Sequence, residues 1–120
     1  MKKVLIVDNS MFMRKFEKKI IEQGGFQDIF EASGKEEAIE IFNNENPEIV
    51  LLDLNMSEFT MDGVEVLTDI MKINSEVAVF IISAVGHENV KDECLALGAK
   101  KYIKKPFDAD TLLKALDEYK

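Results

Sequence analysis

The sequence predicts an α/β protein in which helices cover both faces of a doubly wound, five-stranded parallel sheet. Its strongest apolar runs, such as "EIVLLDL" (48–54) and "VAVFIIS" (77–83), are continuous rather than alternating, which is typical of parallel strands buried on both faces. These runs alternate with segments of helical periodicity, and parallel neighbours need such crossovers, which are almost always right-handed. A chain of 120 residues has room for one domain.

Each element follows from its own segment. In chain order, "KVLIVD" predicts the first strand, "QDIFEA" a weaker second, "EIVLLDL" the third, "VAVFIIS" the fourth and "KYIK" a short fifth. These strands occupy 3–8, 27–32, 48–54, 77–83 and 101–104. Helical patterns lie after each of them, at about 11–23, 34–45, 62–73, 87–97 and 108–119.

Capping residues support the helix boundaries. We expect Ser33 to be the N-cap of the second helix, because acidic residues follow in its first turns. Gly98 stands where a left-handed C-cap of the fourth helix belongs. Either Asp108 or Asp110 is expected to cap the last helix.

Composition and charge exclude several classes of protein. A net charge of -8 argues against broad contact with nucleic acid phosphates, and the lysines of 98–107 indicate a solvated surface. The single cysteine, Cys94, allows neither an internal disulfide nor a paired zinc site and is expected to be a small buried residue. No leader segment is expected, because the opening residues do not show a charged and then apolar stretch with a small-residue cleavage site, and the longest apolar run, 77–82, is too short for a membrane span. The sequence therefore favours a cytoplasmic protein.

Polar residues follow four of the apolar runs at the point where each ends. They are Asp8 with Asn9, Asp53, Ser83, and Lys105 before a proline. The carboxyl ends of parallel strands share one edge of the sheet, where ligands bind. We therefore expect these side chains to meet.

The residue types at this edge are those of phosphoryl transfer to an aspartate. Two close carboxylates, Asp8 and Asp53, repel each other unless a cation lies between them, and Mg²⁺ suits oxygen ligands. Lys105 can neutralise a phosphoryl oxygen, while the Ser83 hydroxyl can donate to another. Taken singly, each residue has a simpler interpretation, such as a turn aspartate or a surface lysine. The combination favours a functional site.

These residues stand in motifs that resemble the receiver domain of bacterial two-component response regulators, of the single-domain chemotaxis type. The motifs are "VLIVDNSMFMRK", "PEIVLLDLNM", "MDGVEVL", "VFIISA" and "GAKKYIKKPF". The resemblance spans essentially the whole chain, so it implies one receiver domain over 1–120. It also implies the flavodoxin-like strand order 2-1-3-4-5.

The resemblance assigns roles to individual residues. It implies that Asp53 is the phosphoacceptor and that Ser83 supplies the family's hydroxyl. Lys105, rather than Lys104, corresponds to the phosphate-pairing lysine, and Tyr102 to the aromatic switch residue. The implied Mg²⁺ ligands are Asp8, Asn9, Asp53 and the backbone carbonyl of Asn55.

Two departures from the family pattern bear on this site. The family usually has a second acid after the first strand, where this chain has Asn9, so weaker Mg²⁺ binding is expected. Family members commonly have Met-Pro after the phosphoacceptor; here "MSEFTMDG" has Ser57 in place of the proline, and two additional residues. Without the proline ring the loop should move more, and Phe59 becomes either an exposed contact or a plug. A harmless insertion explains the loop at least as well as an altered lifetime of the phosphorylated form does.

The resemblance implies a signalling receiver rather than an enzyme. Its partners would be a histidine kinase or phosphotransfer protein, and a target that binds the fourth helix, fifth strand and last helix. A monomer is expected, with no direct binding to nucleic acid or membrane. Because the sequence shows no attached output domain, the output is expected to be another protein.

Other functions remain open. A binding module of the same fold that no longer uses phosphate would account for Asn9 and the altered loop. A phosphohydrolase acting through an aspartyl intermediate should have an acid at position 55, where the chain has Asn55. A flavin carrier of the same architecture is disfavoured, because this chain has no phosphate cradle rich in Gly, Ser and Thr after its first strand. His87 is expected to be a solvated cap rather than a phosphodonor.

Overall fold

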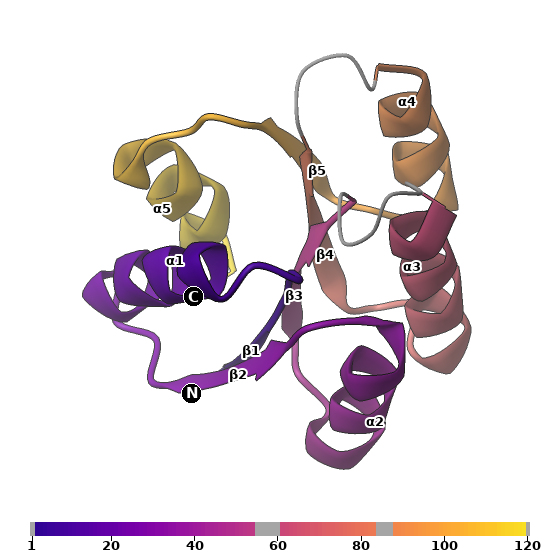
Figure 1. The fold of residues 1–120 in the computed structure, drawn as a ribbon, viewed down its shortest axis with the longest axis horizontal. Helices are drawn as coiled ribbons and strands as arrows, with labels where there is room; N and C mark the ends of the chain where they lie inside the picture. Colours follow the sequence, from indigo (N-terminus) through magenta and orange to yellow (C-terminus); the bar gives the residue numbers. More distant parts are fainter. Residues whose placement is uncertain (1, 55–60, 84–87, 120) are drawn as a thin grey trace.

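The computed structural model describes residues 2–54, 61–83 and 88–119, in which strands and helices alternate (Figure 1). The strands are β1 (Lys3–Val7), β2 (Asp28–Ala32), β3 (Ile49–Asp53), β4 (Ala78–Ser83) and β5 (Lys101–Lys104). The helices are α1 (Met11–Gln23), α2 (Lys35–Glu45), α3 (Met61–Ile73), α4 (Glu88–Leu97) and α5 (Ala109–Asp117). All the predicted elements are present, and the last helix ends two residues earlier than expected.

The sheet is parallel throughout, with the strand order β2-β1-β3-β4-β5. Helices α1 and α5 cover one face, and α2, α3 and α4 cover the other (Figure 1). The predicted fold class and order are confirmed. Because the winding reverses between β1 and β3, the carboxyl ends of these two strands mark the switch point where such sheets bind ligands.

Two apolar layers explain why the strand sequences are continuous. Leu5 and Val7 of β1 pack with α2 and α3 residues, whereas Val4 and Ile6 pack with residues of α1 and α5. Alternate side chains of one strand thus enter opposite layers, and both must be apolar. Cys94 is buried in the first layer, as expected, and burial, with a smaller effect of Glu93, raises the pKa of its thiol to about 11.

Two of the three predicted caps are confirmed. Gly98 has a φ of +119°, and Asp108 caps α5 by accepting from the Thr111 amide at 2.9 Å. The prediction for Ser33 is wrong, because the N-cap of α2 is Gly34, which makes no side-chain cap hydrogen bond. The Ser33 amide instead donates to the Glu37 carboxylate at 2.7 Å. The Glu37 side chain, in the first turn of α2, therefore reaches back to Ser33, the residue before the N-cap.

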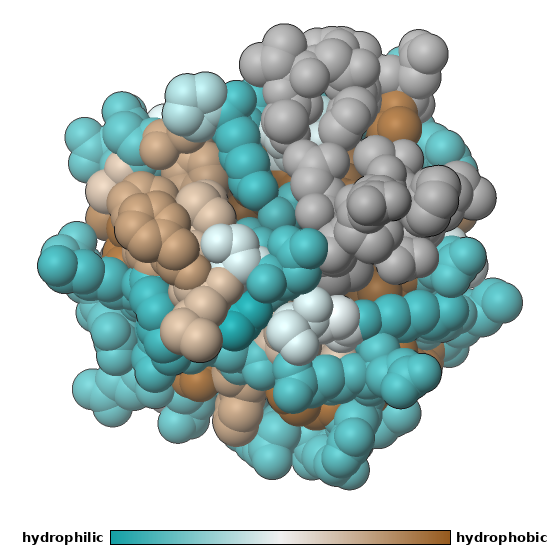
Figure 2. Space-filling model, viewed as in Figure 1, coloured by the Kyte–Doolittle hydropathy of each residue, from teal (hydrophilic) through white to brown (hydrophobic). Residues whose placement is uncertain are grey.

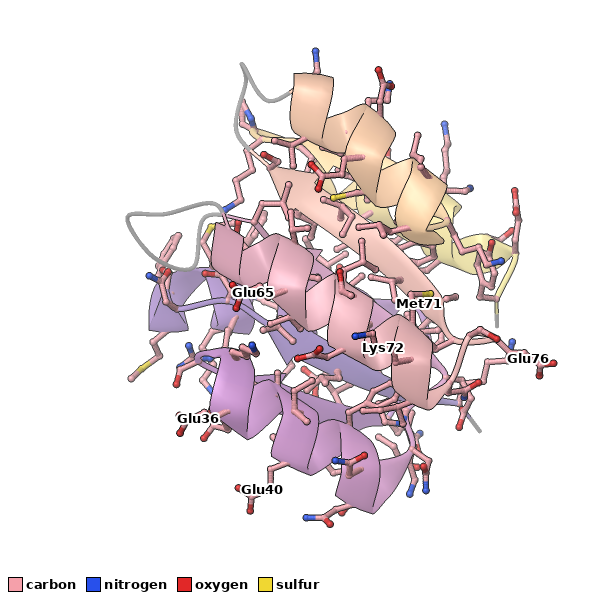
Figure 3. The ribbon with its side chains drawn as sticks, turned by 90° about the vertical axis from the view of Figure 1, so that its right-hand side faces the viewer. Glu36, Glu40, Glu65, Met71, Lys72 and Glu76 are labelled. Atoms are coloured by element: carbon pink, nitrogen blue, oxygen red, sulfur yellow. The ribbon has the colours of Figure 1, made fainter. Side chains whose placement is uncertain are left out.

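The outer surface of α2 and α3 is acidic (Figure 3). These helices lie side by side, and Glu36 and Glu40 extend from α2 into solvent. Between the helices, Lys35 Nζ lies 3.0 Å from Glu65 Oε2 and 3.6 Å from an oxygen of Asp69. Across the described ranges, no helix combines the length and apolarity needed to cross a membrane.

Candidate functional site

The ends of β1 and β3 bring two buried carboxylates to one cation. Asp8 is 1% exposed and Asp53 is 3% exposed. Lys105 Nζ lies 2.8 Å from Asp53 Oδ2 and 4.0 Å from Asp8 Oδ2. The predicted meeting of these three side chains is therefore observed, and the lysine offsets the repulsion between the acids.

Asp8 is fixed by local hydrogen bonds that leave one carboxylate oxygen available. Its amide donates to the Ala32 carbonyl at 3.0 Å, and its Oδ1 accepts from the Ser10 amide at 2.9 Å. Oδ2 is buried and has no hydrogen-bond partner within the described part of the chain. Burial raises the pKa of Asp8 to about 6, despite the Ser10 amide, with Asp53 raising it further and Lys105 lowering it. An additional cation beside Asp8 would stabilise its ionised carboxylate.

Lys105 reaches the acids because its backbone is held at the end of β5. Its amide donates to the Ser83 carbonyl at 2.7 Å, and the peptide bond to Pro106 is cis. Lys104, one residue earlier, is exposed. The alternation of a strand thus sends consecutive lysines in different directions, and it is Lys105 that contacts Asp53.

Ser83 and Tyr102 lie on the neighbouring strands. Ser83 is buried at the end of β4, next to Ile82, which pairs in register with Asp53. Tyr102 of β5 is partly buried; its hydroxyl oxygen is buried and finds no hydrogen-bond partner among the residues described. The Lys91 ammonium of α4 lies 5.8 Å from the centre of the tyrosine ring. Ser83 and Tyr102 therefore lie on the paired strands β4 and β5, and Tyr102 is near Lys91 of α4.

The donor set fits a hard divalent cation such as Mg²⁺. The buried Oδ2 of Asp8 accepts no hydrogen bond from the residues that the structure describes, Asp53 supplies a second carboxylate, and Asn9 follows with an amide oxygen. In residues 2–54, 61–83 and 88–119 no three His, Cys, Asp or Glu side chains cluster as a metal site. Mg²⁺ is commonly bound by one or two carboxylates and keeps several waters, and Asp8 and Asp53 supply two carboxylates here. Asn55, Ser57, Phe59 and His87 lie outside the described residues.

Two residues near the site were not predicted. Glu17 of α1 is 1% exposed, and burial raises the pKa of its carboxyl to about 8, with smaller effects of Asp8, Lys105 and Asp53. Its position was readable from the sequence, since Glu17 follows Met13 by four residues and precedes Ile21 by four on an apolar face. The second residue, Arg14, donates to the Asp8 carbonyl at 2.6 Å.

An apolar cavity of about 380 Å³ adjoins the site. It is lined by Phe12, Met13, Phe16, Lys105, Pro106 and Phe107. Figure 2 shows hydrophobic side chains gathered over α1 and the start of α5, and Phe12 is 77% exposed. Because Lys105 belongs to both features, a partner that reaches the carboxylates would also meet this apolar surface.

Comparison with known proteins gives consistent matches over nearly the whole chain. The response regulator receiver domain family matches residues 4–117. The chain is 40% identical over 118 residues to the chemotaxis protein CheY of Listeria monocytogenes serovar 1/2a, covering 98% of each. It is 33% identical over 117 residues to sporulation initiation phosphotransferase F of Bacillus subtilis strain 168, covering 98% of this chain and 92% of that protein. The crystal structure of the receiver domain of NtrX from Brucella abortus superposes with a TM-score of 0.90 at 28% identity, covering 97% and 96% of the two chains.

Proposed function

The chain belongs to the response regulator receiver domain family, and on this premise we propose that it accepts a phosphoryl group on Asp53 from a partner kinase's phosphohistidine. The observation that carries the proposal is the contact between Lys105 Nζ and Asp53 Oδ2 at 2.8 Å. A buried carboxylate beside a fixed ammonium, at the switch point of the sheet, is equipped to receive a phosphoryl group.

In the transfer, an oxygen of Asp53 attacks phosphorus while the bond from phosphorus to the histidine nitrogen breaks. Lys105 neutralises charge on a phosphoryl oxygen, and the Ser83 hydroxyl donates to another. Mg²⁺ would be held by Asp8, Asn9, Asp53 and the backbone carbonyl of Asn55, and when bound it supplies further neutralisation of phosphoryl charge.

Phosphorylation is proposed to change a protein-binding surface formed by α4, β5 and α5. The phosphoryl group offers Ser83 a new acceptor, and the serine's movement opens space for Tyr102. A local change of charge thus shifts the population of two surface states. Tyr102 supports this proposal, because it is partly buried, its hydroxyl has no hydrogen-bond partner among the described residues, and the centre of its ring lies 5.8 Å from the Lys91 ammonium of α4. We further propose a cytoplasmic, monomeric signalling module rather than an enzyme, whose phosphodonor covers the apolar surface at Phe12.

Intact mass measurement tests the proposed function. We expect incubation with Mg²⁺ and phosphoramidate to add one phosphate to the parent protein and none to Asp53→Ala. The Asp69→Ala variant, an acid on α3 that pairs with Lys35, is the control and should be modified like the parent. An unmodified parent would instead support the phosphate-independent binding module, which Asn9 favours. Equal modification of Asp53→Ala would place the acceptor elsewhere.

Replacing Asn9 by aspartate is expected to tighten Mg²⁺ binding. One more negative charge at about 4 Å is worth on the order of 1 to 4 kcal/mol before hydration offsets part of it. We therefore expect the affinity for Mg²⁺ to rise roughly three- to tenfold. Calorimetric titration measures the change. Asn74→Asp adds the same charge after α3, before β4, and should leave the affinity unchanged. Equal affinities of Asn9→Asp and the parent would contradict this account.

A further inference from the structure

Arg14 connects the candidate site to a neighbouring strand. From the first turns of α1, its Nη1 donates to the Asp8 carbonyl at 2.6 Å and its Nε donates to Glu31 Oε1 at 3.3 Å. The arginine side chain is only 13% exposed. One guanidinium therefore joins α1, the residue after β1 and the end of β2 through its fixed fork of donors.

Glu31 is held ionised at its end of this connection. Lys15 Nζ lies 2.8 Å from Glu31 Oε2, and Lys18 Nζ lies 3.9 Å from the same oxygen. Burial raises the pKa of Glu31, but Lys15, Arg14 and Lys18 together outweigh it and hold that pKa below its usual value. The carboxylate therefore remains a charged anchor for the guanidinium at neutral pH.

The Asp8 carbonyl lies just beyond the last bond of the β1–β2 ladder. The Asp8 amide is the last group there to donate across to β2, at Ala32. Its carbonyl is held by Arg14, and its Oδ1 by the Ser10 amide. With three of its polar atoms fixed, Asp8 keeps Oδ2 directed so that it lies 4.0 Å from Lys105 Nζ.

We infer that Arg14 is a positioning residue for the metal site, acting through the Asp8 backbone. The inference rests on the proposed function, because it assigns Asp8 as an Mg²⁺ ligand. Without Arg14 the turn from Asp8 to Ser10 loses one of its fixed points, and the ligand oxygen spends less time in place. Groups that orient metal ligands commonly affect affinity as much as some ligands do.

The charge of Arg14 makes the inference testable by the sign of the effect. A nearby cation repels Mg²⁺, so a purely electrostatic role predicts tighter binding when Arg14 is replaced by methionine. Positioning predicts the opposite, about tenfold weaker binding. Lys15→Met is the matched control, since Lys15 also pairs with Glu31 but is not seen to contact Asp8. It should bind Mg²⁺ as tightly as the parent or slightly more tightly.

The experiment measures Mg²⁺ affinity by calorimetric titration, and Asp53 phosphorylation by phosphoramidate as a function of Mg²⁺ concentration. For Arg14→Met we expect the half-saturating Mg²⁺ concentration to rise about tenfold while the rate at saturation stays within about twofold of the parent. Arg14→Lys retains the positive charge but has a single donor group, so its half-saturating Mg²⁺ concentration should lie between those of the parent and Arg14→Met. Urea unfolding establishes that each variant is folded.

Affinity for Mg²⁺ in Arg14→Met equal to or tighter than in the parent overturns the inference but leaves the proposed function standing. If Arg14→Met does not fold, Arg14→Lys decides, because its charge is unchanged. Weaker Mg²⁺ binding by this lysine variant than by the parent then supports positioning, and equal binding overturns it. A parent that neither binds Mg²⁺ nor is phosphorylated overturns the proposed function and this inference together.

Discussion

Replacing Glu17 by glutamine is expected to abolish most of the loss of stability that the parent protein shows as pH rises from about 5 to about 8.5. The Glu17 carboxyl is 1% exposed, and its Oε2 has no hydrogen-bond partner in the described residues. Burial raises its pKa from 4.5 to about 8, with Asp8 and Asp53 raising it and Lys105 opposing them. Ionisation is therefore much less favourable in the folded chain than in the unfolded one.

The sign follows from proton binding. Between pH 4.5 and about 8 the folded state holds a proton on Glu17 that the unfolded state has released. The contribution of Glu17 to stability is therefore fully present below its pKa in the unfolded chain, and it is lost as pH rises through its pKa in the folded chain. Because a difference of one pKa unit between the folded and unfolded states corresponds to about 1.4 kcal/mol, the free energy of unfolding should fall by roughly 3 to 5 kcal/mol as pH rises over this interval.

Urea unfolding at pH 5, 6.5 and 8.5 in metal-free buffer measures this dependence. Comparing each variant with itself across pH cancels the constant cost of burying an amide. A smaller slope remains in Glu17→Gln, because the pKa of Asp8 is also raised, to about 6. Glu22→Gln, an exposed acid on the same helix, should keep the parent's slope. Parallel pH profiles for the parent and Glu17→Gln would show that Glu17 ionises normally in the folded protein.

Replacing Lys105 by methionine is expected to slow phosphorylation of Asp53 by about a hundredfold or more. Removing one fixed group that stabilises developing charge typically has an effect of this size. Lys105 Nζ is 2.8 Å from the accepting carboxylate and 4.0 Å from Asp8. The transferred phosphoryl oxygens would lose this cation.

The rate is measured by intact mass after timed incubation with phosphoramidate at saturating Mg²⁺. Lys104→Met is the control, because Lys104 is exposed and adjacent in sequence, and its rate should stay within about twofold of the parent. Mg²⁺ should bind Lys105→Met at least as tightly as the parent, since a competing cation is gone. A rate unchanged in Lys105→Met, or equal losses in both lysine variants, would contradict the proposed role.

The elements of the fold were predictable because their causes are local. A strand covered on both faces is apolar at every position, so Ile49–Leu52 of β3 could be recognised without knowing its neighbours. The cap at Ser33 was mispredicted because the Ser33 amide and hydroxyl both donate to the Glu37 carboxylate, and the N-cap position falls one residue later, at Gly34. The strand order came from the family resemblance, since pairing joins segments far apart and leaves no local pattern.

The sequence by itself determined that an acid stands at or directly after the ends of β1 and β3, and a lysine directly after β5. The shared edge of a parallel sheet then implied that Asp8, Asp53 and Lys105 meet. Only the tertiary structure decided the environments of Glu17 and Arg14. The shift in the pKa of Glu17 depends on water excluded by other elements, and Arg14 contacts a carbonyl after β1 and a carboxylate of β2 at once. The spacing of Glu17 on an apolar helix face indicates that it is buried, but the degree to which water is excluded and the distant groups that Glu17 and Arg14 meet depend on the packed chain.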